Sequence, residues 1–198
     1  MGKAFTDKER ELIKETIKKE AFELFKIYGI RKTSISQITK MAGISQGGFY
    51  SFYKNKEELF YEIMDDDMDM QIEHCLSYIE ESVKDPFNRL YLCIKHNCMH
   101  MRKNRAIWLD EPDIMKILNE RKEEDNIKER EKLTKVINTF YNFWRERNCI
   151  SFMDCGKLVS LFLIARTMYI NKECCNDDDF EEIFDNFIIN SINKYLKL

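Results

Sequence analysis

The 198-residue chain contains little of the two residue types that interrupt helices, with only 2 prolines and 6 glycines. Its 44% hydrophobic and 34% charged residues are typical of a helix-rich globular protein and exclude a disordered or fibrous chain. No apolar run approaches the roughly 18 uncharged residues of a membrane-spanning helix, and no apolar secretion signal follows Met1. We therefore expect a cytoplasmic protein with no membrane partner.

The seven cysteines do not form the pattern of a zinc knuckle or a disulfide framework. They contain no Cys-x-x-Cys pair, and an odd number in a cytoplasmic chain indicates reduced thiols. The pair Cys174-Cys175 is interpreted as part of a flexible connection rather than as a redox switch. There is also no nucleophile elbow, phosphate-binding loop or pair of catalytic carboxylates, so we expect no enzyme and no cofactor. A Cys/His hydrolase using His96 or His100 is an alternative, but neither histidine has an evident partner acid.

The net charge of the chain is only -3, but the charged residues are distributed unevenly. Residues 1–60 carry 12 Lys/Arg and 8 Asp/Glu, whereas residues 61–198 carry 20 and 27. A basic head on an acidic body is consistent with a protein that presents one end to a polyanion.

Hydrophobic residues recur at helical spacing along almost the whole chain, without a period-two strand pattern, so we predict an all-α fold. Two capping boxes, Thr6 with Glu9 and Ser34 with Gln37, begin the first two helices. Gly29 and Gly43 end those helices. The spacing then predicts a third helix over 46–53, after Ser45, and a long fourth helix that begins near Asn55 and carries an apolar stripe to Val83.

The second half of the chain is predicted to contain four further helical regions. Asp85-Pro86 starts a helix that reaches about Lys103, because proline is tolerated in a first helical turn. After a broken stretch around Pro112, a long helical region extends to about Arg147. The segment 154–170 is apolar nearly all round, which predicts burial on more than one side, and 178–196 shows a regular apolar stripe.

The segment 34–53 has the spacing of a helix-turn-helix, with Gly43 permitting the sharp turn. The stretch from Thr33 to Phe60 resembles the signature of the tetracycline repressor (TetR) family. The matching features are Thr33, Ala42-Gly43-Ile44-Ser45, Gly47, Phe49-Tyr50, Tyr53, Lys56 and Leu59-Phe60. Thr39 and Gly48 depart from the usual pattern, which bears on the operator preference. The alternative interpretation is a three-helix cap with ordinary surface lysines.

The resemblance implies that the helix-turn-helix contacts DNA. Gln46 is expected to pair with adenine in the major groove, while Gly47 and Gly48 allow the backbone to approach closely. Hydroxyl and lysine side chains suit phosphate oxygens. The predicted DNA-contacting residues are Thr33, Ser45, Gln46, Gly47, Gly48, Phe49, Tyr50, Lys54 and Lys56, of which Phe49 also fits a core position.

The resemblance further implies two domains: a helix-turn-helix domain over 1–55, and a helical effector-binding and dimerisation domain over 56–198. Two recognition helices of a dimer reach successive major grooves when they lie roughly 34–36 Å apart, so DNA recognition also favours a homodimer. The predicted dimer contacts, which could instead be intramolecular core, are Leu158, Phe162, Phe184, Phe187 and Ile188. The expected partners are operator DNA and a hydrophobic small-molecule effector.

Large, adaptable or amphipathic side chains of the central helices are the candidates for the effector pocket, although most could simply be core. They are His96, Met99, His100, Trp108, Tyr141 and Trp144, with Met101 and Phe140 nearby. Cys93, His96 and His100 also share one helical face, so metal sensing is an alternative even though we expect no metal. A regulator without any effector is a further alternative.

Overall fold

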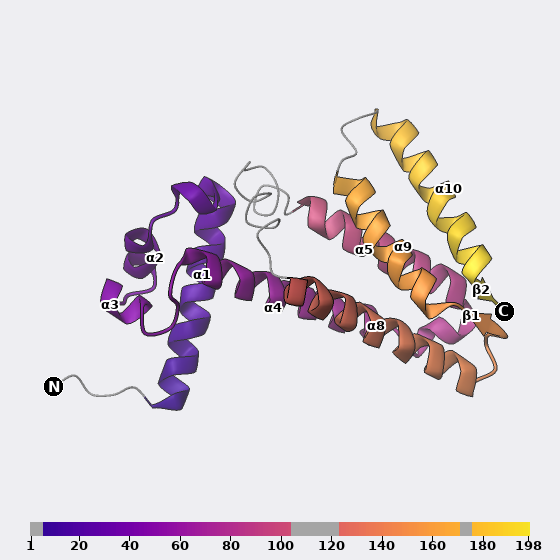
Figure 1. Cartoon of the computed structure of the whole chain (residues 1–198), viewed down its shortest axis with the longest axis horizontal. Coiled ribbons are helices and arrows are strands. Elements are labelled where there is room, and N and C mark those ends of the chain that lie inside the picture. The colour runs from indigo at the N-terminus through magenta and orange to yellow at the C-terminus, as the bar shows by residue number, and fades with distance from the viewer. Residues whose placement is uncertain (1–5, 104–122, 171–175) are drawn as a thin grey trace. The chain divides into compact units, whose positions relative to one another are not determined.

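The computed structural model describes residues 6–103, 123–170 and 176–198 (Figure 1). Those up to Met68 form one compact unit, and those from Asp69 onward form a second. We refer to them as the N-terminal and C-terminal units. Nearly all of the described residues are helical, which confirms the all-α prediction. None of the described helices combines the length and the apolar character needed to span a membrane.

The helix starts of the N-terminal unit follow the local capping signals. Helix α1 spans Asp7–Lys32 and α2 spans Ile35–Met41, and both predicted capping boxes are formed. Within α1 the backbone departs from helical geometry at Gly29, whose φ is 76°. Gly43, with a φ of 68°, takes the left-handed conformation that ends α2. The glycines therefore change the chain direction where the sequence predicted it.

Helix α3 is shorter than predicted, since it spans Gln46–Phe49 and is followed by turns that end at Phe52. Two adjacent glycines in its middle weaken it, because glycine loses more conformational entropy in a helix than other residues. Helix α4 then spans Lys56–Ser77, and Asn55 Oδ1 accepts the backbone N–H of Glu58 at 2.8 Å. The predicted domain boundary at residues 55/56 lies at the start of α4, whereas the two units meet within this helix.

Aromatic side chains fill the core of the N-terminal unit. Phe25 of α1 and Phe60 of α4 meet edge to face, with ring centroids 6.1 Å apart. Phe49 of α3 lies 5.7 Å from Tyr53, and both are buried. Ile38 of α2 is also fully buried in this cluster. The core thus joins all four helices and holds α2 and α3 in a defined arrangement.

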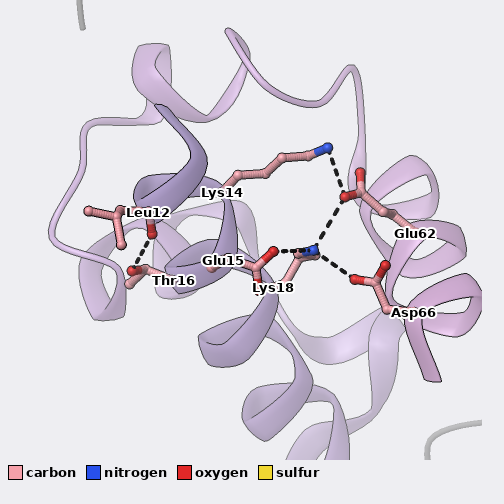
Figure 2. A network of polar contacts seen from close by, with 7 residues as sticks. All are labelled: Leu12, Lys14, Glu15, Thr16, Lys18, Glu62 and Asp66. Atoms are coloured by element: carbon pink, nitrogen blue, oxygen red, sulfur yellow. Dashed lines mark hydrogen bonds and ion pairs between the residues drawn. The ribbon is translucent and has the colours of Figure 1, made fainter. Parts of the chain in front are cut away.

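Ion pairs also join α1 to the first half of α4 (Figure 2). Lys18 Nζ lies 2.7 Å from Asp66 Oδ2 and 3.5 Å from Glu62 Oε1, while Lys14 Nζ lies 2.8 Å from Glu62 Oε1. Partial burial disfavours the charge of Lys18, but hydrogen bonds to Asp66 and Glu15 outweigh that effect and raise its pKa. Because Lys18 is mostly shielded from solvent, this network holds the two helices together more firmly than an exposed ion pair would.

The C-terminal unit contains the rest of α4, a 3-10 segment η1 (Glu81–Lys84) and four helices. These are α5 (Pro86–Lys103), α8 (Glu123–Glu146), α9 (Cys155–Ile170) and α10 (Asp177–Tyr195). Helix α9 packs against α5, α8 and α10 (Figure 1). Its buried residues Leu158, Val159, Leu161, Phe162, Ala165 and Tyr169 confirm burial on more than one side.

Two details of the C-terminal unit differ from the sequence prediction. Helix α4 ends at Ser77, and Val83, where the apolar stripe was predicted to end, lies in η1 and is 37% exposed. Two short strands, β1 (Phe152–Met153) and β2 (Leu196–Lys197), pair antiparallel. Two-residue strands carry no detectable alternation, and their pairing depends on the tertiary contact between the ends of α9 and α10.

Candidate nucleic-acid interface

The turn between α2 and α3 is held by backbone and side-chain hydrogen bonds. The Ile44 N–H donates to Thr39 O at 3.0 Å, and Ser45 Oγ accepts the Gly48 N–H at 3.0 Å. A Cβ atom at position 48 would lie 3.3 Å from Ser45 Oγ, a close contact that glycine avoids. Ser45 therefore serves as the N-cap of α3, in addition to its predicted role at DNA.

One side of α3 is open to solvent while the opposite side is buried. Gln46 and Gly47 are exposed, and 58% of the Tyr50 surface is accessible. Phe49 has no exposed surface and packs beneath them, so the structure places it in the core. A Cβ atom at Gly47 would meet only Ser45 Oγ, at 3.9 Å. The exposed side of α3 thus presents one amide, one phenol and a stretch of backbone without side chains.

Comparison with known proteins agrees with this geometry. Residues 17–63 match the family model of bacterial regulatory proteins of the tetR family. Residues 17–63 therefore form a tetR-family domain. An uncharacterized HTH-type transcriptional regulator of Bacillus subtilis (strain 168) is 40% identical over 50 residues. This alignment covers 25% of the present chain and 26% of that relative, so about a quarter of each protein is matched.

Solved structures extend the similarity of fold beyond the tetR-family domain. A TetR transcription regulator from Haloarcula marismortui ATCC 43049 has a TM-score of 0.67 at 15% identity, covering 94% of this chain and 100% of that one. A transcriptional regulator from Cytophaga hutchinsonii ATCC 33406 has a TM-score of 0.65 at 16% identity, covering 93% and 98%. At these identities the likeness establishes the fold alone.

Two of the predicted phosphate contacts of the tetR-family domain are engaged within the protein. Thr33 is fully buried, and its hydroxyl donates to Gly29 O at 2.8 Å. Lys56 Nζ donates to the carbonyl oxygens of Ile30, Arg31 and Thr33, at 2.8, 3.3 and 2.6 Å. Lys54, by contrast, is exposed. The structure therefore assigns Lys56 to the chain segment that follows Gly29 and leaves Lys54 open to DNA.

Arg10 is a candidate that the sequence analysis missed. Its Nη2 donates to Ser51 O at 3.2 Å, and its guanidinium carbon lies 4.8 Å from the centroid of the Phe52 ring. Arg10 is exposed and places a cation beside the turn that follows α3. Arg10 and Ser51 are 41 positions apart in the sequence, so no local pattern connects them.

Removing the charge of Lys54 and removing that of Lys56 should have contrasting effects. A Lys56→Met variant should lose about 1.5–3 kcal/mol of unfolding free energy, because three carbonyl oxygens lose a charged donor. Lys54→Met should leave the unfolding free energy within about 0.5 kcal/mol of wild type and lower the salt dependence of DNA binding. Urea unfolding of both variants measures the first effect. Equal stability of the two variants would show that the carbonyl contacts of Lys56 contribute little.

The predicted pocket residues of the C-terminal unit differ in their exposure to solvent. Trp144 is fully buried, Tyr141 is partly buried, and Met99 is 52% exposed. His96 is exposed and His100 is partly buried, whereas Trp108 lies outside the described residues, as does the stretch around Pro112. A groove of about 330 Å³ along α8 is lined by Ile127, Arg130, Glu131, Thr134 and Lys135, none of them predicted.

Two of the residues predicted as candidate metal ligands, Cys93 and His96, have different contact partners. The thiol of Cys93 is buried and hydrogen-bonded to Cys75, whereas His96 stacks on His74 with ring centroids 4.2 Å apart. Within the part of the chain that the structure describes, no group of three or more His, Cys, Asp or Glu side chains is placed to hold a metal ion. Cys174 and Cys175 lie outside that part.

The surroundings of His96 predict a pH effect. Partial desolvation of its ring, which stacks on His74, and then the nearby charges of His74, His100 and Arg89 lower its pKa below the ordinary 6.5. The folded state thus favours neutral His96, and the resulting stability is lost as the pH falls from 6.5 through the lowered pKa. Between pH 7.5 and 5, the melting temperature of His96→Gln should therefore fall less than that of wild type. An equal decrease in both proteins would contradict this cause.

Most of the predicted dimer contacts are buried inside their own unit. Leu158, Phe162, Phe184 and Ile188 have at most 4% exposed surface, and Phe184 packs 5.0 Å from Tyr169 and 5.6 Å from Phe180 between ring centroids. Phe187 is half-buried. Among the residues of α9 and α10 whose side chains the structure describes, the exposed large apolar ones are Ile164, at 50%, and Ile183, at 61%.

Proposed function

We propose that this chain is a DNA-binding transcriptional regulator that acts as a homodimer, and that a small molecule bound by the C-terminal unit releases it from its operator. The observation that supports DNA binding most directly is the exposed side of α3. Gln46 and Tyr50 are accessible there, and the buried Phe49 holds them on a rigid core. An amide and a phenol next to bare backbone are suited to base edges and phosphates in a major groove.

The exposed faces of α9 and α10 support a homodimer. Ile164 and Thr167 are exposed at helical spacing on one side of α9, and Ile183 and Asn190 are exposed on one side of α10. A surface of apolar and small polar residues allows close packing against a second copy. The predicted contacts Leu158, Phe162, Phe184 and Ile188 would then support this surface from beneath.

Buried polar atoms on α4 and α5 support the binding of a small molecule. Gln71 is 6% exposed, yet its Oε1 has no hydrogen-bond partner among the described residues. Asn97 Oδ1 and Arg102 Nη1 are also buried and have no hydrogen-bond partner among the described residues. Each such atom costs about 1–3 kcal/mol, which a ligand with complementary polar groups would recover. To release DNA, the ligand must bind more tightly to the conformation that fits the operator poorly.

Selection from random-sequence duplexes tests the proposed function without knowledge of the operator. We expect the wild-type protein to enrich an inverted repeat whose half-sites lie about one helical turn apart, because a dimer presents two copies of α3. Affinity for the enriched duplex should fall steeply as salt increases. A small molecule that raises the melting temperature should also weaken this binding. Recovery of unenriched DNA after repeated rounds would overturn the proposal.

A further inference from the structure

The last turns of α4 meet the first half of α5 through a set of close contacts. Arg89 Nη2 donates to Cys75 O at 2.7 Å, and the Arg89 guanidinium carbon lies 4.8 Å from the centroid of the Tyr78 ring. His74 precedes Cys75 in the sequence, and its ring stacks on that of His96 at an interplanar angle of 15°. These contacts hold the two helices close together at the level of Cys75.

Two cysteine side chains face each other within this contact. Cys75 of α4 is 5% exposed and Cys93 of α5 is 3% exposed, and their thiols are hydrogen-bonded to each other. Arg89 precedes Cys93 by one helical turn, and its Nε has no hydrogen-bond partner among the described residues. Two adjacent thiols therefore lie beside the Arg89 guanidinium, whose Nε–H has no acceptor among the described residues.

We propose that Cys75 and Cys93 are a dithiol that a hydroperoxide, such as hydrogen peroxide, oxidises to a disulfide linking α4 to α5. Neither cysteine has a role in the proposed DNA contacts. The reaction adds a modification site to the chain, and its chemistry does not depend on the proposed function.

The surroundings assign different roles to the two thiols. The hydrogen bond from Cys93 and the positive charge of Arg89 lower the pKa of Cys75, although burial opposes them. The same thiol pairing, followed by burial, raises the pKa of Cys93, although the charge of Arg89 opposes the rise. Cys75 is therefore the better source of thiolate, which is the nucleophilic form of cysteine.

The oxidation proceeds in two balanced steps. The Cys75 thiolate attacks one peroxide oxygen, so that an S–O bond forms, the O–O bond breaks and hydroxide leaves, to be protonated to water. Cys93 sulfur then attacks Cys75 sulfur, so that the S–S bond forms, the S–O bond breaks and the sulfenic hydroxyl leaves as hydroxide, which takes up the Cys93 proton to give water. In total, two thiols and one hydrogen peroxide yield one disulfide and two water molecules.

Peptide mapping of the full-length protein tests the proposal. Reduced wild type is treated with hydrogen peroxide, alkylated without reductant and digested. We expect one cross-linked species joining the peptides of Cys75 and Cys93, lighter by two hydrogens than the two thiol peptides together. Recovery of both peptides alkylated, or of Cys75 linked to another cysteine, would overturn the proposal. The wild-type result is decisive by itself, so it does not depend on whether a variant folds.

Variants then separate the roles of the individual residues. Cys93→Ser should abolish the cross-link and leave Cys75 as a sulfenic acid that a dimedone probe captures, whereas Cys155→Ser should form the cross-link as wild type does. Arg89→Gln should slow the cross-linking several-fold, and Arg89→Lys should restore part of the rate because it keeps the charge. An unchanged rate in Arg89→Gln would contradict the role of Arg89. Because the readout is mass, failure of DNA binding would not affect these results.

Discussion

A Gln46→Ala, Tyr50→Ala double variant should lose on the order of 100-fold in affinity for the selected duplex, because one good pairing with a base edge contributes about 1–3 kcal/mol. Both side chains are exposed on α3, so their removal creates no cavity in the core. The melting temperature should therefore remain close to that of wild type. Competition binding against scrambled DNA measures the expected loss, which should be larger for the selected sequence than for the scrambled one.

Tyr28→Ala provides the matched control, because Tyr28 is 49% exposed and lies on α1, outside the helix-turn-helix segment 34–53. This variant should bind the selected duplex as wild type does. If the double variant kept its preference for the selected sequence, base recognition would have to come from other residues. The assignment of α3 as the recognition helix would then be wrong.

Trp144→Ala should lower the unfolding free energy of the protein by about 3–5 kcal/mol, the usual cost of removing a large buried aromatic side chain. Trp144 has no exposed surface and its ring centroid lies 5.0 Å from that of Phe140. Its indole N–H also donates to Ser82 Oγ at 2.6 Å and thereby joins α8 to η1. Urea unfolding followed by circular dichroism measures the loss.

Tyr141→Ala serves as the comparison, because Tyr141 lies on the same helix and is only partly buried. Its unfolding free energy should decrease by clearly less than that of Trp144→Ala. This pair of variants decides whether Trp144 is core, as its burial indicates, or lines an effector pocket, as the sequence analysis suggested. A Trp144→Ala protein of wild-type stability with impaired ligand response would favour the pocket.

The features that could be predicted from sequence are those with a local cause. The capping boxes at Thr6 and Ser34 need only residues three positions apart, and Gly43 needs only its own freedom to adopt a positive φ. The end of α3 was predicted four residues too late, because the apolar spacing continues to Tyr53 although Gly47 and Gly48 weaken the helix.

The candidate sites were less predictable, because their geometry depends on residues far apart in the chain. From the sequence, Lys54 and Lys56 were predicted to be equivalent phosphate contacts. The fold distinguishes them, because it brings the Lys56 ammonium to the carbonyl groups that follow Gly29. The sequence grouped Cys93 with His96 and His100 on one helix, whereas in the structure the contact partners of Cys93 and His96 come from α4. A pattern within one helix contains no information about the neighbouring helix.

The sequence by itself determined the helical class, most helix starts and the tetR-family head, since backbone capping, helical periodicity and a contiguous motif all act over short distances. Only the tertiary structure decided which side of each helix is buried against a neighbour. It placed Trp144, Leu158 and Phe184 in the core and brought Cys75 to Cys93. Such choices depend on how side chains from distant segments fill a shared volume, and close packing admits only combinations that fit together.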